Sequence, residues 1–158
     1  MTTCQHCKRA IGRDAHDTPL YIDECCAAAI PQMLRRMGFC VVPQRKSAQD
    51  VDWLPRAGRE GWTVITQDSR ILTNKDELEA LIANRVKCFI LPPAVTGAWE
   101  QVRAFASAWD KIVAESRGPG PFVWKITTRA ARCGGKRSIR NPTVSSRWTS
   151  RRFQWGIC

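Results

Sequence analysis

The sequence predicts a three-layer α/β domain around a central, mainly parallel sheet of five strands. Three observations predict this fold class. Short apolar runs alternate with longer stretches of helical character, the runs are apolar at successive positions, and 158 residues have room for one compact domain. Strands that alternate with helices of this length form crossover units on a parallel sheet, and helices on both faces of such a sheet favour strands that are apolar on both sides.

Five strands and four helices are predicted between residues 19 and 127. The strands are apolar runs bounded by turn residues, and they cover residues 19–23, 39–43, 62–68, 87–93 and 121–127. The helices carry apolar residues at a spacing of three or four, and they cover residues 25–38, 48–61, 74–86 and 96–116.

Capping residues support the helix boundaries. Gly38 is typical of a helix C-terminus and ends the first helix, in which Pro31 fits only near the start or at a kink. Asp50 and Asp52 open the second helix, where the positive end of the helix dipole favours acids. Asn74 is expected to cap the third helix.

The two ends of the chain lack this periodicity. Residues 1–18 are expected to form an irregular leader, residues 19–127 the folded domain, and residues 128–158 a basic and flexible tail. The tail holds eight arginine and lysine residues and no acid, so it carries most of the net charge of +11. Basic surfaces attract polyanions, which makes nucleic acid the natural partner class, although a basic tail can also be a solvated end.

The cysteines and apolar runs indicate a compartment. The chain has eight cysteines, but its opening residues lack the apolar segment of a secretion signal, and no apolar run approaches the length of a membrane span. We therefore expect a cytoplasmic protein with reduced thiols and no membrane partner. Cys4, His6, Cys7 and His16 are soft metal ligands in the leader, but a structural zinc site normally needs a second pair, and none is clear.

Acids follow two of the predicted strands and open the helix between them. Asp23 ends the first strand, Asp68 ends the third, and the helix leading into the third strand begins with Asp50 and Asp52. Because the carboxyl ends of parallel strands meet at one edge of the sheet, we expect these carboxylates there. Clustered carboxylates repel one another unless they share a cation, and oxygen ligands of this kind suit Mg²⁺ or Mn²⁺.

A divalent ion at this edge predicts phosphodiester hydrolysis, because the ion activates a water and stabilises charge on the phosphate. The alternative is that the acids are separate helix caps that share an edge. Aspartate is a common cap, and Asp68 can close a turn with its own backbone.

Three segments of the chain resemble a known family. "LYID" followed by a helix, "QDVDWLPRAGREGWTVITQDSRI" and the "ELEAL" helix look like the PIN-like nuclease domains related to VapC toxins. The resemblance is to the branch with a D-x-[DE]-W-L-P segment and a G-W-x-V-[IL]-T-x-D strand, and it covers residues 19–127. It implies a PIN-like fold, ribonuclease activity that depends on Mg²⁺ or Mn²⁺, and often a toxin role with a cognate antitoxin protein as partner. A homodimer stays open.

The resemblance assigns four residues as catalytic groups and metal ligands, which are Asp23, Asp50, Asp52 and Asp68. One position departs from the wider group. Many relatives carry a second acid two residues after the last one, and this chain has Arg70 there. Glu24 could supply the missing carboxylate, but a neighbour of Asp23 in an extended strand would point to the opposite face.

Basic residues on or near this edge are candidates for holding RNA phosphates, and they are Arg45, Lys46, Arg56, Arg70 and Lys75. Of these, Arg70 and Lys75 are the RNA-binding residues we expect. Trp62 is expected to pack against the sheet. Trp99 and Trp109 lie on the apolar stripe of the longest helix, which predicts core positions for both.

Two other functions stay open beside the endoribonuclease. Arg70 in place of an acid favours an incomplete domain that binds RNA or a partner protein without cleaving RNA. A phospho-acceptor domain of the response-regulator type also has acids at strand ends. That type expects a lysine at a late strand edge, and "ILPP" at residues 90–93 provides none.

Overall fold

The computed structural model describes residues 18–42, 50–127 and 154–157, without the side chains of residues 50, 51 and 154–157. The strands are β1 (Leu20–Ile22), β2 (Val41–Val42), β3 (Thr63–Thr66), β4 (Lys87–Ile90), β5 (Phe122–Lys125) and β6 (Gln154–Ile157). The helices are α1 (Ala29–Arg36), α2 (Asp50–Arg59), the 3₁₀ helix η2 (Ser69–Leu72), α3 (Lys75–Ala83), α4 (Ala98–Ser107) and α5 (Trp109–Ser116). The strands form one sheet in the order β2-β1-β3-β4-β5-β6.

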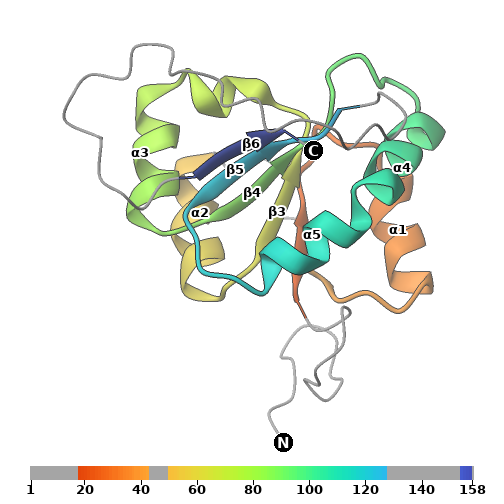
Figure 1. Cartoon of the computed structure of the whole chain (residues 1–158), viewed down its shortest axis with the longest axis horizontal. Helices are drawn as coiled ribbons and strands as arrows, with labels where there is room; N and C mark the ends of the chain where they lie inside the picture. Colours follow the sequence, from red (N-terminus) through yellow and green to blue (C-terminus); the bar gives the residue numbers. More distant parts are fainter. Residues whose placement is uncertain (1–17, 43–49, 128–153, 158) are drawn as a thin grey trace, which may run out of the picture.

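All neighbouring strands in the sheet are parallel, and helices cover both of its faces (Figure 1). On one face, α1, α4 and α5 pack around Ile22, Ile65 and Phe89. On the other face, α2, η2 and α3 pack around Val64 and Cys88. The predicted three-layer α/β class is therefore confirmed. In the described part of the chain, no helix is long and apolar enough to cross a membrane.

The sheet has one strand more than the five that the sequence predicts. β6 pairs in parallel with β5, with Val123 opposite Trp155. These residues belong to the segment 128–158 that we expected to be a flexible tail. Their "QWGI" run has only four residues, which is too short to identify a strand without its neighbour. Residues 128–153, residues 1–17 of the leader, and residues 43–49, which include Arg45 and Lys46, lie outside the described residues.

Aromatic stacking fixes α2 on the sheet. The Tyr21 ring stacks on Trp53 with centroids 4.5 Å apart and on Trp62 at 5.6 Å. Trp62 is 3% exposed, which confirms the prediction that it packs against the sheet. The Arg56 guanidinium lies 5.2 Å from the Trp62 ring and pairs with Glu60 at 2.6 Å. Arg56 thus makes structural contacts in the last turn of α2.

The helix predicted over residues 96–116 is two helices, α4 and α5, which meet at Ala108. Trp109 packs on Phe39 and Phe105, with ring centroids 4.5 and 5.4 Å apart, in agreement with its predicted core position. Trp99 is 70% exposed, so the core position predicted for it is wrong. The buried face of α4 carries Gln101 and Phe105, and the helical repeat turns Trp99 to the opposite side.

Candidate active site

Asp23 and Asp68 follow β1 and β3, which are neighbours in the sheet. From β1 the chain moves to β2 on one side, then crosses to β3 on the other side, so the strand order reverses between β1 and β3. In open parallel sheets, such a switch point forms a crevice outside the carboxyl ends of the strands, where ligands bind. The backbone N–H of Asp23 donates to the Ile65 carbonyl at 2.9 Å, which anchors Asp23 at this edge.

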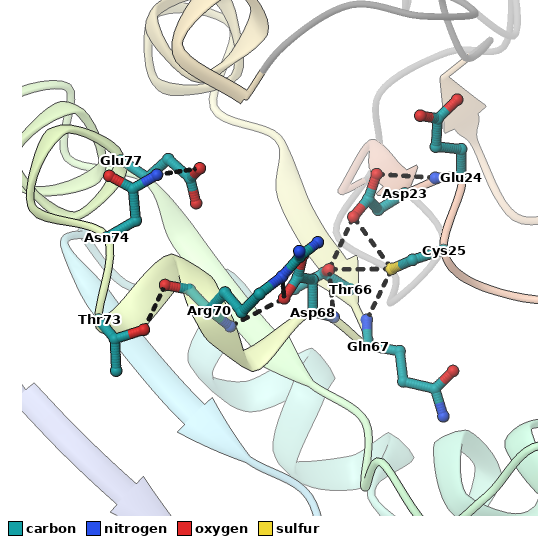
Figure 2. Close-up of polar contacts among 10 residues, drawn as sticks. All are labelled: Asp23, Glu24, Cys25, Thr66, Gln67, Asp68, Arg70, Thr73, Asn74 and Glu77. Carbon is teal, nitrogen blue, oxygen red and sulfur yellow. Dashed lines mark hydrogen bonds and ion pairs between the residues drawn. The ribbon is translucent and has the colours of Figure 1, made fainter.

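Thr66, the last residue of β3, joins the two acids. Its hydroxyl donates to Asp23 Oδ2 at 2.7 Å and accepts from the Asp68 backbone N–H at 3.0 Å (Figure 2). Thr66 is only 2% exposed, so these contacts orient the hydroxyl without competition from water. The sequence pattern does not single out Thr66, although its place two residues before Asp68 is a usable signal.

Asp23 is 7% exposed, and both oxygens of its carboxylate accept hydrogen bonds. Oδ1 accepts from the Glu24 backbone N–H at 2.7 Å, and Oδ2 accepts from the Thr66 hydroxyl and from the Cys25 thiol at 3.1 Å. These bonds compensate for the cost of burying the carboxylate. Glu24 is exposed, and Figure 2 shows its carboxylate pointing away from Thr66, so it does not join Asp23 at the edge.

Cys25 lies between the two strand ends. Its Sγ is 3.2 Å from Thr66 Oγ1 and accepts from the Gln67 backbone N–H at 3.1 Å. A hydrogen bond with Cys26 lowers the pKa of the Cys25 thiol, which burial opposes. The same hydrogen bond, together with burial, raises the pKa of the Cys26 thiol. In the sequence, the position of Cys25 two residues after Asp23 is a usable signal for its place in the site.

Arg70 holds the Asp68 carboxylate. Oδ1 accepts from the Arg70 backbone N–H at 2.8 Å, which makes Asp68 the N-cap of η2. The Arg70 guanidinium contacts both carboxylate oxygens, through Nε at 3.0 and 2.9 Å and through Nη2 at 2.6 Å. Figure 2 shows this pair beside Thr66. The capping role that the sequence left open for Asp68 is therefore present.

The Arg70 contact changes the acidity of Asp68. Hydrogen bonding to the guanidinium lowers the pKa of Asp68 below its ordinary value of 3.8, although partial burial opposes the shift. The Arg70 side chain is 85% exposed, so this ion pair lies at the surface and is screened by water and salt.

Arg70→Ala is expected to raise the pKa of Asp68 toward 3.8, because only the backbone N–H bond is left to favour the carboxylate. A carboxyl carbon NMR titration measures this change. Since the pKa of Asp68 is lowered in the folded protein, the pair stabilises the fold above pH 3.8, and this stabilisation is lost as the pH falls through the folded pKa. Arg59→Ala, which removes an exposed charge from α2, should leave the pKa of Asp68 unchanged. Equal Asp68 pKa values in Arg70→Ala and wild type would contradict the pair.

The structure describes the two acids of α2 only in part. Asp50 is the first residue of α2, its side chain is not described, and Asp52 is exposed. Among the described residues, no group of three or more histidine, cysteine, aspartate or glutamate side chains could hold a metal ion. Asp23 and Asp68 lie side by side at the edge, but the Arg70 guanidinium binds the Asp68 carboxylate. The described donors therefore do not form a complete Mg²⁺ or Mn²⁺ site by themselves.

Lys75 is the first residue of α3, and its side chain is 84% exposed. Its Nζ is 3.9 Å from Glu79 Oε1, a long and weak ion pair. Asn74 caps α3 as predicted, since its side chain accepts from the Asp76 backbone N–H at 3.1 Å. Arg70 and Lys75 are thus both accessible to a phosphate on the α3 side of Asp68.

Two glutamines fasten α4 to the same edge. Gln67 Nε2 donates to the carbonyls of Pro92 at 3.0 Å and Val95 at 2.6 Å. Gln101 of α4 is 3% exposed, donates to Gln67 Oε1 at 3.0 Å and accepts from the Ala27 backbone N–H at 2.7 Å. The sequence pattern gives no signal for this network, because its partners lie far apart along the chain.

The fold and this edge define a class of protein, an all-parallel α/β domain with paired acids at the point where the strand order reverses. Residues 19–93 match the family model of the PIN like domain. The match runs from β1 to the loop after β4 and includes Asp23 and Asp68, so it supports a PIN-like domain and suggests a nuclease-type fold. No curated protein and no solved structure matches the chain.

Proposed function

We propose that this protein is a metal-dependent endoribonuclease that hydrolyses RNA phosphodiester bonds at the edge between β1 and β3. The observation that carries this proposal is the Thr66 hydroxyl, which joins the Asp23 carboxylate to the backbone of Asp68 at the switch point of the sheet. The PIN-like match over residues 19–93 supports nuclease chemistry at this edge.

Mg²⁺ or Mn²⁺ would be held by Asp23 and Asp68, with Asp50 and Asp52 from the start of α2. When bound, the ion supplies an activated water and stabilises charge on the phosphate. Thr66 and the Glu24 N–H keep the Asp23 carboxylate in one orientation.

Arg70 has a defined part in this function. The Arg70 guanidinium must leave Asp68 before the Asp68 carboxylate can serve as a metal ligand. An RNA phosphate can take the place of that carboxylate on Arg70, because a guanidinium binds carboxylates and phosphates in the same two-point geometry. Arg70, with Lys75, would then hold the RNA backbone.

The resemblance of the sequence to PIN-like domains related to VapC toxins supports two further parts of the proposal. The protein would be the toxin of a toxin-antitoxin pair, and a cognate antitoxin would be its protein partner. We also propose that it acts in the cytoplasm. A neighbouring reading frame that encodes an antitoxin would support this role, and its absence would count against it.

The ion pair between Arg70 and Asp68 favours a second function. If Arg70 stays on Asp68, Asp23 is the one acid at the described ends of β1 and β3 whose carboxylate is not held by the Arg70 guanidinium. The domain would then bind RNA or a partner protein without cleaving RNA.

Asp68→Asn is expected to reduce the cleavage of end-labelled RNA in Mn²⁺ by at least about tenfold, because it removes a ligand charge. The amide oxygen can still accept from the Arg70 N–H, so the cap of η2 is kept. Asp76→Asn, an exposed acid in the first turn of α3, is the matched control and should cleave normally. Full cleavage by Asp68→Asn would contradict the site, and tight RNA binding by wild type without cleavage would favour the second function.

A further inference from the structure

Trp99 is an unusual surface residue of this protein. It is 70% exposed, whereas Trp53 and Trp62 are buried in the core and Trp109 packs between two phenylalanine rings. A large exposed aromatic side chain offers apolar surface that a ligand can cover, and tryptophan is enriched where proteins make contacts.

Trp99 lies at the same edge of the sheet as the two acids. β4 ends at Ile90 at this edge. Gln67, the residue before Asp68, holds the loop after β4 at the same edge by donating to the carbonyls of Pro92 and Val95. Trp99 follows in the first turn of α4. Gln101 fixes this end of α4 by its bonds to Gln67 and Ala27. The indole is therefore presented on a rigid element beside the site.

Arg103 lies next to Trp99 on the exposed side of α4. It is exposed and lies four residues after Trp99, on the side of α4 opposite the buried Gln101 and Phe105. Side chains four residues apart on a helix are neighbours. An aromatic plane next to a guanidinium is the combination that binds single-stranded nucleic acid, since a base stacks on the ring and a phosphate pairs with the cation.

We propose that Trp99 and Arg103 form a docking surface for single-stranded RNA, in which a base stacks on Trp99 and a phosphate contacts Arg103. The inference rests on the proposed RNA substrate. α4 covers one face of the sheet and α3 the other, so Arg103 and the exposed pair Arg70 and Lys75 lie on opposite sides of Asp68. A strand of RNA that crosses the edge would meet positive charge on both sides. Paired bases do not expose their faces, so the surface fits a single strand.

The test measures binding of a fluorescein-labelled oligouridylate by fluorescence anisotropy, in EDTA so that the RNA is not cleaved. Trp99→Ala is expected to raise the Kd by about tenfold, and Trp99→Tyr, which keeps a stacking ring, to raise it much less. Met37→Ala is the matched control. Met37 is 58% exposed and is the C-cap of α1, at the end of that helix away from the carboxyl edge of the sheet. Arg103→Ala should reduce the slope of log Kd against log salt by about 0.7.

Each outcome decides the inference. A Kd for Trp99→Ala equal to that of wild type would overturn it. So would an unchanged Kd combined with a changed sedimentation coefficient, which would make Trp99 a contact with a second copy of the chain. Failure of wild type to bind the RNA would overturn the proposed function as well. RNA binding that depends on Trp99 supports the docking surface even if no cleavage is seen in Mn²⁺.

Discussion

Asp23→Asn is expected to reduce RNA cleavage by at least about 100-fold and to leave the fold intact. Replacing residues that only support a metal ligand typically costs about 10–100-fold, so loss of a ligand charge should cost more. The fold is kept because asparagine has the same shape. Its oxygen can accept from the Glu24 N–H, and its amide can donate to Thr66, whose hydroxyl is then free to donate to Cys25. Cleavage of labelled RNA in Mn²⁺ and thermal unfolding, measured on the same preparation, check both parts.

Two variants separate chemistry from stability at this position. Glu24→Gln removes the neighbouring carboxylate, which is exposed and turned away from Thr66, and should cleave at the wild-type rate. Asp23→Ala removes the acceptor shared by the Thr66 hydroxyl, the Glu24 N–H and the Cys25 thiol, and should lower the free energy of unfolding by about 1–3 kcal/mol. Cleavage by Asp23→Asn at the wild-type rate would show that Asp23 stabilises the fold and takes no part in catalysis.

Gly58→Ala is expected to destabilise the fold by at least about 1–3 kcal/mol. A Cβ on Gly58 would lie 1.9 Å from the backbone carbonyl oxygen of Asn84 and 2.8 Å from its carbonyl carbon. Asn84 is the C-cap of α3, and its side chain is bonded to the Ala80 carbonyl, so it cannot move without disturbing that helix end. Alanine normally stabilises a helix by about 1 kcal/mol relative to glycine, so a net loss reports the close packing of α2 on α3.

Urea denaturation measures this loss, and Gly97→Ala provides the comparison. A Cβ on Gly97 would have its nearest neighbour at 3.6 Å, an ordinary contact, and the change should cost at most about 1 kcal/mol from the weaker N-cap. If Gly58→Ala were as stable as wild type, α2 and α3 would have to be further apart than the structure has them.

Local patterns predict most elements of this fold. α3 follows from Asn74 and the amphipathic repeat after it, and β3 and β4 follow from short apolar runs between turn residues. β6 and the break at Ala108 do not follow in this way. β6 is a strand only because β5 offers it an edge, and the break depends on how α4 and α5 each pack against the same face of the sheet.

The site was predictable to a smaller extent. Asp23 and Asp68 could be placed at one edge because parallel strands end together there. The ion pair between Arg70 and Asp68 could not be predicted, because it depends on the backbone turn that starts η2. Ligation of a metal by Asp23, Asp50, Asp52 and Asp68 stays a prediction.

The sequence by itself determined the order of strands and α-helices from β1 to β4, the parallel α/β class and the two acids that follow β1 and β3. These features depend on residues close together in the chain, where spacing and capping act directly. Only the tertiary structure decided that Thr66 joins Asp23 to Asp68, that Gln101 fastens α4 to the same edge and that Trp99 faces solvent. Thr66 and Asp23 are 43 residues apart, and Ala27 and Gln101 are 74 apart. Contacts over such separations depend on strand order and helix packing, which local patterns do not specify.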